Sequence, residues 1–483
     1  MDKLKNPKVA LVVLDGWGIR KERQYNAIAQ ANTPHWDALV ATYGQSLLTA
    51  SGEPVGLPRG QMGNSEVGHM HIGSGQVIPQ DLLRINEALK NGDLARRVMR
   101  LIETKKPKKV HLMGLYSGGG VHAHAAHWHA VMAAIPASIT VDCHVFTDGR
   151  DTPPTSARGA LMQLQKQCKQ HPNCSIASIA GRYYAMDRDQ RWERTNQWMD
   201  MLSMPATLQS AIKYIDDMYA KNITDEFLIP AKLNHSTIEH DDLVIIMNFR
   251  ADRVKQLLSQ FTDYPNVVTM TAYSDREALF AKLVPDASLG YVFADAGLSQ
   301  VRIAETEKFA HVTYFLNGGH DACFPGEKRV LVPSPKVASY EHCPEMAAGS
   351  VTKHIEAAMA EGMNAIFANY ANADMVGHTG DFAATIKAIE CLDECIGQLT
   401  KAAKQYGYRL AFCADHGNAE WMWRPEQNEV VTSHTCSSVP FVMNVKQPKK
   451  LRGTLIDIAP TILDGFGLAV PKSWQGKSLL LHK

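Results

Sequence analysis

The sequence predicts an α/β protein with two domains. A chain of 483 residues is longer than one hydrophobic core usually covers, so two domains are expected. Short apolar runs rich in β-branched residues alternate with stretches of helical periodicity, which is typical of buried parallel strands joined by helices. Most of these runs end in a charged residue or histidine, at the strand ends where open α/β sheets bind their ligands.

Composition argues against several classes of partner. A net charge of +1 gives no electrostatic reason to expect nucleic acid or an anionic membrane. The nine cysteines are odd in number and contain no Cys-x-x-Cys pair, which argues for a reducing compartment. The first apolar run, Val9–Leu14, is too short for a signal peptide or a membrane span. We therefore expect a cytoplasmic protein.

The first part of the chain predicts one strand and two helices. Val9–Leu14 is a continuous apolar run, which predicts a buried strand with Asp15 at its carboxyl end. Pro34 suits the first turn of a short helix. Gln80–Lys90 has helical spacing of its apolar residues.

Between these helices, Gly60–His69 surrounds one serine with glycines. Glycine allows a positive φ angle and close approach of the backbone to a ligand, so this stretch predicts a shaped loop or helix start. The candidate functional atom is the hydroxyl oxygen of Ser65, which is a weak nucleophile unless a base or a metal ion activates it. We therefore expect the activating groups elsewhere in the chain.

The middle of the chain predicts one α/β unit. Helical stretches such as Ser156–Cys168 separate its strands. The predicted strands are Val110–Leu115, Ile139–Phe146, Ile176–Ala180 and Leu243–Met247.

The last part predicts a second series of strands and helices. The predicted strands are Val312–Leu316, Ala365–Tyr370 and Leu410–Ala414, with Val330–Pro335 extended. Val351–Ala360 and the long amphipathic stretch Phe382–Ala403 are predicted to be helical.

Three carboxylates and three imidazoles lie at the predicted strand ends or in adjoining loops. They are Asp15, Asp374, His378, Asp415, His416 and His434. One Asp-x-x-x-His pair is weak evidence because such pairs are common on helix surfaces, but the combination indicates a site for two metals. Mixed oxygen and nitrogen ligands suit Mn²⁺, Zn²⁺ or Co²⁺ better than Mg²⁺ alone.

Five arginines follow the strands of the middle segment. They are Arg150, Arg182, Arg188, Arg250 and Arg253. Any one of them could simply pair with a neighbouring aspartate, but as a group they indicate a small polyanionic substrate. In the cluster His122–His129, His122 and His129 are predicted to share a helical face, where histidines would only pack or cap. His122 also directly follows a glycine turn, where a substrate contact is expected. No phosphate-binding glycine motif follows a strand, so a nucleotide is not expected.

Seven motifs occur in order along nearly the whole chain. They are Leu14–Gly18, Gly63–His69, Asp148–Asp151, Gly181–Arg188, Asn248–Arg253, Ala304–Lys308 and Asp415–Gly417. In these motifs the chain resembles the cofactor-independent (2,3-bisphosphoglycerate-independent) phosphoglycerate mutases of the alkaline phosphatase superfamily.

The resemblance implies a fold and a reaction. An alkaline-phosphatase-like α/β domain, residues 1–77 and 287–483, would bind two metals, and residues 78–286 would form an inserted α/β phosphotransferase domain. The implied isomerase interconverts 3-phosphoglycerate and 2-phosphoglycerate in glycolysis and gluconeogenesis through a phosphoserine on Ser65, without 2,3-bisphosphoglycerate. Mn²⁺ is the expected metal, with Co²⁺, Mg²⁺ or Zn²⁺ as alternatives, and the family implies a monomer.

The resemblance also implies roles for single residues. One metal would be held by Asp374, His378 and His434, and the other by Asp15, Ser65, Asp415 and His416. The substrate site would be lined by Asn64, His122, Arg150, Asp151, Arg182, Arg188, Arg250, Arg253 and Lys308. Asp151, assisted by His122, would move protons as general acid and base. Lys308 would neutralise charge on the phosphoryl oxygens, to which Asn64 would donate.

Two alternatives stay open at this point. A metal-dependent phosphohydrolase or a phosphopentomutase would share the metal ligands, although neither explains the motifs Asp148–Asp151 and Arg250–Arg253. A catalytically silent metal-binding or interaction protein is a different class, and the intact Ser65 among complete ligand sets disfavours it.

Overall fold

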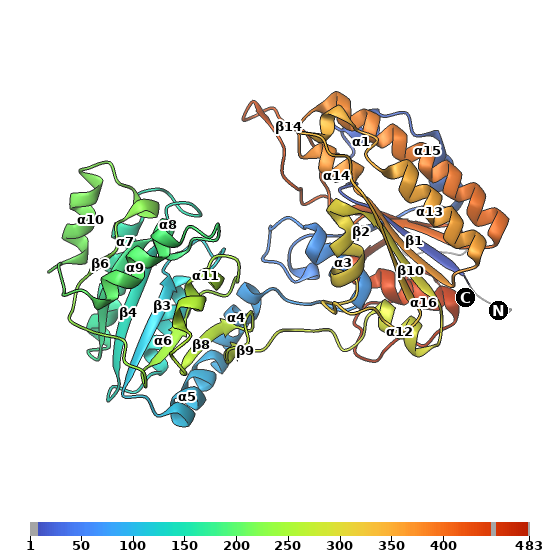
Figure 1. Cartoon of the computed structure of the whole chain (residues 1–483). Coiled ribbons are helices and arrows are strands. Elements are labelled where there is room, and N and C mark those ends of the chain that lie inside the picture. Colours follow the sequence, from blue (N-terminus) through green and yellow to red (C-terminus); the bar gives the residue numbers. More distant parts are fainter. Residues whose placement is uncertain (1–7, 446–450, 482–483) are drawn as a thin grey trace. The chain divides into compact units, whose positions relative to one another are not determined.

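The computed structural model describes residues 8–445 and 451–481 and forms two compact units. Met1–Pro79 and Val284–Lys483 together make up the discontinuous unit, and Gln80–Leu283 make up the inserted unit. Each unit has its own β-sheet with helices packed against it (Figure 1). The chain therefore passes between the units twice, once in each direction.

The discontinuous unit is built on an eight-stranded sheet. In spatial order its strands are β11 (Glu327–Val332), β10 (Gln300–Glu305), β12 (Ala365–Tyr370), β1 (Val9–Leu14), β13 (Arg409–Cys413), β16 (Val439–Met443), β2 (Ser46–Thr49) and β17 (Arg452–Thr454). β1 lies between β12 and β13 and runs parallel to both, as expected for a fully buried apolar strand. β16 runs antiparallel to β13.

Helices cover the sheet of the discontinuous unit. α13 (Ala348–Glu361) and α15 (Phe382–Tyr406) pack together on one face, and α3 (Ser65–Ser74), α12 (Leu289–Asp295) and α16 (Ile458–Phe466) gather on the other (Figure 1). Shorter helices are α1 (Ala27–Gln30), α2 (Pro34–Tyr43) and α14 (Asn372–Gly377). The prediction that Pro34 opens a helix is confirmed, because Pro34 is the first residue of α2.

The inserted unit is built on a seven-stranded sheet. In spatial order its strands are β6 (Ala231–Lys232), β5 (Cys174–Gly181), β4 (Thr140–Thr147), β3 (Lys109–Leu115), β7 (Leu243–Ile246), β8 (Val267–Thr271) and β9 (Ala278–Phe280). The four strands predicted for the middle segment are the neighbouring parallel strands β5, β4, β3 and β7, so the prediction of one α/β unit is confirmed.

Two helices of the inserted unit precede its first strand, and the others lie between its later strands along the chain. In chain order the helices are α4 (Asp81–Lys90), α5 (Asp93–Lys105), α6 (Ala125–Ala134), α7 (Ala157–Gln170), α8 (Arg182–Ala185), α9 (Trp192–Ser203), α10 (Ala211–Tyr219) and α11 (Lys255–Leu258). Among the helices within residues 8–445 and 451–481, none has both the length and the apolar character of a membrane span.

Two local predictions were wrong. The run Val312–Leu316 is not a strand, because His311–Phe315 form a π-helical turn that packs against α3. Val312 and Leu316 are both buried and lie four residues apart. Residues at this spacing lie on one face of a helix and also on one face of a strand, so the sequence pattern fits both. His122 and His129 do not share a helical face, because α6 begins only at Ala125 and His124 is its N-cap.

A buried chain of polar side chains crosses the sheet of the inserted unit. His111 on β3 lies with Nε2 3.1 Å from Asp242 Oδ2 and with Nδ1 3.0 Å from His144 Nε2 on β4. His144 Nδ1 lies 2.8 Å from the hydroxyl of Ser178 on β5. Burial, together with the neighbouring His111, lowers the pKa of His144 well below its usual value. The native protein therefore holds His144 neutral.

This neutral histidine predicts a loss of stability in acid. The pKa of His144 is lower in the folded protein than in the unfolded chain, so its contribution is complete above about pH 6.5 and is lost as the pH falls below that value. Each pH unit below this point costs at most about 1.4 kcal/mol per histidine. We expect His144→Gln to unfold at lower denaturant concentration than wild type at about pH 7.5, with a smaller further loss at about pH 5. Equal losses in urea titrations of both proteins would contradict the neutral state of His144.

Candidate functional site

Parallel strands bring the carboxylates of the discontinuous unit to one edge of its sheet. Leu14 is aligned with Tyr370 on β12, and Val13 is aligned with Cys413 on β13, so these strands end together. Asp15 directly follows β1, Asp374 lies in α14 after β12, and Asp415 lies two residues beyond β13. Residues far apart in the sequence therefore meet at the carboxyl edge, where open α/β sheets bind ligands.

Two groups of side chains at this edge could hold metal ions. One consists of Asp374, His378 and His434, and the other of Asp15, Asp415 and His416. In each group the potential ligand atoms lie within 4.8 Å of one another. The structure thus places all six side chains singled out in the sequence, and it divides them as the family pattern implies.

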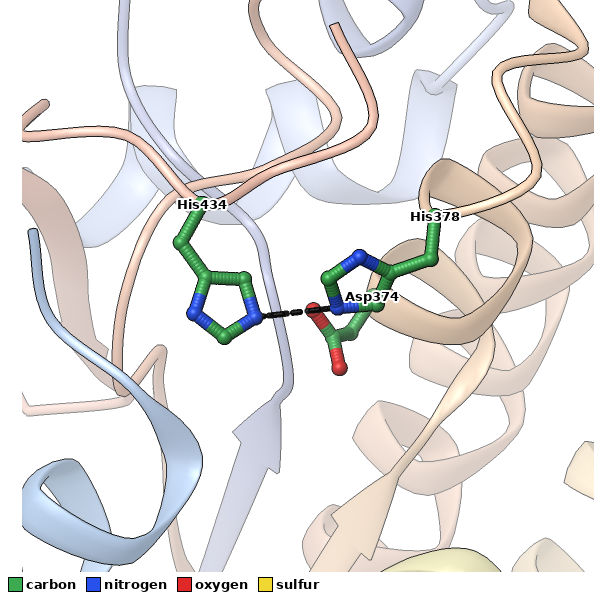
Figure 2. Close-up of side chains that lie close together, drawn as sticks. All are labelled: Asp374, His378 and His434. Atoms are coloured by element: carbon green, nitrogen blue, oxygen red, sulfur yellow. Dashed lines mark hydrogen bonds and ion pairs between the residues drawn. The ribbon is translucent and has the colours of Figure 1, made fainter. Parts of the chain in front are cut away.

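In the first group the side chains point toward one another (Figure 2). His378 Nε2 and His434 Nε2 lie 3.2 and 3.3 Å from the same oxygen, Asp374 Oδ1, and 3.0 Å from each other. The Nδ1 atoms of both rings face carbonyl oxygens, of Thr432 at 2.6 Å and of Gly63 at 2.9 Å. Because carbonyls only accept, each Nδ1 carries a proton, and both Nε2 atoms converge on one carboxylate oxygen of Asp374, whose hydrogen bond raises the pKa of His378. This donor set fits a cation.

The second group is fully buried. Asp15 Oδ1 lies 3.3 Å from His416 Nε2, and Asp415 Oδ1 accepts hydrogen bonds from the backbone N–H groups of His416 and Gly16. Asp415 Oδ2 is buried and accepts no hydrogen bond. Its near neighbours are His69 Nδ1 at 3.2 Å and His416 Nε2 at 3.6 Å, and a buried carboxylate oxygen without a hydrogen bond is costly in a protein interior. The second group therefore also fits a cation.

Lys308 lies between the two groups. Its Nζ donates to Asp15 Oδ1 at 2.9 Å, to Asp374 Oδ2 at 2.6 Å and to the Ser65 hydroxyl at 2.8 Å. Burial would lower the pKa of Lys308, but the two carboxylates raise it above its usual value. Burial is the largest influence on Asp15 and Asp374 and would raise their pKa values, but the Lys308 ammonium and the neighbouring histidines together lower both. The carboxylates are therefore ionised, and the site attracts positive charge.

Ser65 is the first residue of α3 and faces this cluster. Asn64 caps the helix, its side-chain oxygen accepting from the backbone N–H of Val67 at 2.9 Å. The Ser65 hydroxyl lies 3.0 Å from His416 Nε2 and donates to Asp15 Oδ1 at 3.2 Å. Gly68 allows the first turn of α3 to lie close to Asp415, because a Cβ atom at position 68 would lie 2.6 Å from the Cβ of Asp415. A helix N-terminus also favours a negative charge at this position.

The inserted unit carries the arginines. Arg182 is buried, and its Nη1 donates to Asp148 Oδ1 at 2.7 Å and to Asp151 Oδ2 at 2.6 Å. Arg188 and Arg250 are about half exposed and flank Asp252 at 3.2 and 3.6 Å. Arg150 is exposed and lies 3.5 Å from Glu226. The more exposed guanidinium groups keep donors available for a ligand.

Arg253 and His122 belong to the same cluster. Burial, and then the charges of Arg188, Arg182 and Arg150, lower the pKa of Arg253, so these guanidinium groups converge. His122 lies 3.8 Å from Asp151 Oδ2, and burial followed by the charge of Arg182 lowers its pKa to about 4. His122 is therefore neutral near pH 7.

Other histidines of the stretch 122–129 bond elsewhere. His124 accepts from the backbone N–H of Ala126 as the cap of α6, and His127 Nε2 lies 2.8 Å from Asn86 Oδ1. His129 Nε2 lies 2.6 Å from the hydroxyl of Tyr116.

Sequence reasoning missed several residues that contact the proposed metal ligands. His69 and Asn369 lie beside Asp15, Ser65 and Asp415. Asn418 Nδ2 donates to Asp374 Oδ1 at 2.9 Å. Two features of the sequence could have indicated these residues. His69 lies in the glycine-rich stretch, and Asn369 is an amide in the otherwise apolar strand β12.

The chain is similar to known proteins over nearly its whole length. The family model of the metalloenzyme superfamily matches residues 7–470. A Legionella pneumophila protein (strain Philadelphia 1) named 2,3-bisphosphoglycerate-independent phosphoglycerate mutase is 46% identical, with 98% of each chain covered. A Synechococcus protein (strain JA-3-3Ab) of the same name is 44% identical over 99% of this chain and 97% of its own. The crystal structure of a Leishmania mexicana phosphoglycerate mutase, determined at low cobalt concentration, matches 100% of this chain and 99% of its own, with 28% identity and a TM-score of 0.68.

The ligand geometry predicts that divalent metal stabilises the protein. Removing metal by dialysis against a chelator leaves like charges buried at the carboxyl edge, so the melting temperature should fall and should recover when metal is returned. Metal at about 100 times its dissociation constant contributes about 2.7 kcal/mol for each site. The measurement is a thermal melt with and without metal, and in His434→Ala the recovery should be smaller. A melting temperature that does not respond to metal would contradict the proposed centre.

Proposed function

The chain belongs to the 2,3-bisphosphoglycerate-independent phosphoglycerate mutases, within the metalloenzyme superfamily, and we propose that Ser65 is the residue that carries the phosphoryl group in its reaction. The enzyme is an isomerase that interconverts 3-phosphoglycerate and 2-phosphoglycerate without 2,3-bisphosphoglycerate. The observation that carries the assignment of Ser65 is its hydroxyl at a helix N-terminus, in contact with Asp15, His416 and Lys308.

Ser65 attacks and later returns the phosphoryl group. Its hydroxyl donates to Asp15 Oδ1, and this hydrogen bond directs the proton away from the attacking lone pair. In the first step the bond from Ser65 Oγ to phosphorus forms while the bond from phosphorus to the substrate oxygen breaks; Ser65 loses its hydroxyl proton, and the departing oxygen gains one from Asp151. In the second step the other hydroxyl of glycerate gives its proton to Asp151 and attacks phosphoserine, and Ser65 Oγ leaves and regains a proton.

Lys308 and the start of α3 stabilise the charge on the transferring group. The Nζ of Lys308 lies 2.8 Å from Ser65 Oγ, so its ammonium is placed to neutralise the phosphoryl oxygens. The α3 N-terminus adds backbone donors and a favourable dipole. The Oδ1 atom of Asn64 is used as the helix cap, and its Nδ2 is the candidate donor to a phosphoryl oxygen.

We propose Mn²⁺ as the metal at both groups of ligands, supported by their mixed oxygen and nitrogen atoms. Divalent ions held there would lower the pKa of the Ser65 hydroxyl and would neutralise charge on the phosphoryl oxygens. The Leishmania mexicana structure was determined at low cobalt concentration, and cobalt is compatible with the same kind of donor set.

We propose that the inserted unit holds the glycerate. Arg188, Arg250 and Arg253 present charged donors to the carboxylate and phosphate of the substrate, supported by their partial exposure and mutual proximity. Asp151 exchanges protons with the substrate hydroxyls, and the neutral ring of His122 beside it assists. The discontinuous unit then performs phosphoryl transfer.

Replacement of Ser65 tests the nucleophile. We expect Ser65→Ala to lower mutase turnover by at least about 10⁴-fold, because no other hydroxyl occupies this position. Turnover is measured by coupling 2-phosphoglycerate to its dehydration product, without 2,3-bisphosphoglycerate and with Mn²⁺ titrated. The matched control is Ser74→Ala, since Ser74 lies at the other end of α3.

Mass spectrometry of the protein mixed with 3-phosphoglycerate should place the phosphate on Ser65. Mutase activity that survives Ser65→Ala would refute the phosphoserine assignment. Release of phosphate from 3-phosphoglycerate without formation of 2-phosphoglycerate would instead indicate a phosphohydrolase.

Replacement of Arg250 tests the anion site. We expect Arg250→Gln to raise KM for 3-phosphoglycerate by about 10- to 100-fold, because it removes a charged hydrogen bond to an anion. The control is Arg158→Gln, which removes an exposed guanidinium of the same unit that pairs with Asp216 at 2.7 Å. Steady-state kinetics of both variants give the comparison, and equal KM values would exclude Arg250 from substrate binding.

A further inference from the structure

The two oxygens of Asp15 have different partners. Oδ1 faces the functional cluster, with Ser65 Oγ at 3.2 Å, His416 Nε2 at 3.3 Å and Lys308 Nζ at 2.9 Å. Oδ2 points away from that cluster and accepts from the side-chain Nδ2 of Asn369 at 2.8 Å. Asn369 therefore fixes the rotation of the carboxylate and so determines which oxygen is presented to Ser65.

Asn369 also fixes the orientation of a histidine. Its Nδ2 lies 3.0 Å from His69 Nε2, and an amide nitrogen carries two protons, enough to donate to Asp15 and to His69. An Nε2 that accepts leaves the proton of the neutral ring on Nδ1, and Nδ1 lies 2.9 Å from the carbonyl oxygen of Ser65. The same Nδ1 lies 3.2 Å from Asp415 Oδ2. One continuous chain of contacts thus links Asp15, Asn369, His69, Ser65 and Asp415.

These linked contacts orient side chains of the site as well as satisfying buried polar groups. All the side chains are buried, yet Asn369 Oδ1 and Asp415 Oδ2 accept no hydrogen bond. A network built only for the stability of the core would pair these acceptors as well, since each unpaired one costs roughly 1–3 kcal/mol. The atoms that are paired are those that orient Asp15 and the backbone of Ser65. The Asp415 oxygen that accepts no hydrogen bond, Oδ2, lies 3.6 Å from Nε2 of the candidate metal ligand His416.

We propose that Asn369 and His69 are positioning residues for the metal centre beside Ser65, formed by Asp15, Asp415 and His416. The proposal rests on the proposed function, since it refines the same site. Neither residue contacts the other centre at Asp374, His378 and His434. Loss of the Asn369 amide therefore weakens metal binding at one centre and leaves the other unchanged.

The experiment is calorimetric titration of the metal-free full-length protein with Mn²⁺ alone. Wild type should bind two ions. In Asn369→Leu, whose side chain has the same number and branching of heavy atoms but no donor, one site should weaken by about 10- to 100-fold, as is typical when the hydrogen-bond partner of a metal ligand is removed. The control is Asn444→Leu, which loses side-chain hydrogen bonds to Leu410 and Tyr408 near the start of β13, away from the metal ligands.

A second variant and a kinetic measurement keep the proposal testable. Asn369→Ser keeps a small polar side chain and replaces the leucine variant if that protein does not fold. In either variant a raised Mn²⁺ concentration should restore kcat, whereas it should not restore Ser65→Ala.

The outcomes separate the positioning role from the proposed function. Two unchanged sites in the Asn369 variants, or equal weakening of both sites, would overturn the positioning role while leaving the proposed function intact. Wild type that binds no Mn²⁺ would overturn both. Selective loss of one site, with rescue by metal, would support the positioning role even where the assignment of Ser65 as the nucleophile failed.

Discussion

The contacts of the Lys308 ammonium with Asp15, Asp374 and Ser65 are the interaction on which the candidate site depends. Burying a charge costs several kcal/mol unless the charge is paired, so these carboxylates are tolerable only with positive charge among them. Lys308 supplies one such charge from the turn after β10. Three buried carboxylates around one ammonium leave excess negative charge, which favours cation binding. The converging histidine nitrogens and the Asp415 oxygen that accepts no hydrogen bond are available as ligand atoms for such cations.

The parallel arrangement of β12, β1 and β13 is what brings these charges together. Each strand is buried on both faces and therefore apolar, and polar residues become possible only where the strands end. Glycine then allows the close contacts that the charges require. Gly16 has a φ angle of +76°, and a Cβ atom there would lie 2.8 Å from the Cα of Asp374. A side chain at Gly16 would therefore force apart the loops that carry Asp15 and Asp374.

The two units treat polar groups in different ways. The discontinuous unit concentrates ionised groups at one edge of its sheet. The sheet of the inserted unit instead buries hydrogen-bonded polar side chains, among them the neutral His144, and the unit keeps several arginines partly exposed. Ionised groups suit the binding of cations, and exposed guanidinium groups suit the binding of an anion. This difference supports a division of labour between phosphoryl transfer and substrate binding.

The sequence by itself determined the apolar parallel strands β1, β3, β4, β5, β7, β12 and β13, the α/β class and the residue types that could bind metal and phosphate, because these depend on local periodicity and on the chemistry of single side chains. Ser65, Asp15 and the two Asp–His pairs were recognisable for that reason. Only the tertiary structure decided that Val312–Leu316 is helical, since a five-residue apolar run fits either period and packing against α3 selects one. It also revealed Asn369 and His69, whose roles depend on which groups lie opposite them across neighbouring strands and α3. Such contacts join residues 300 positions apart, and no local pattern encodes them.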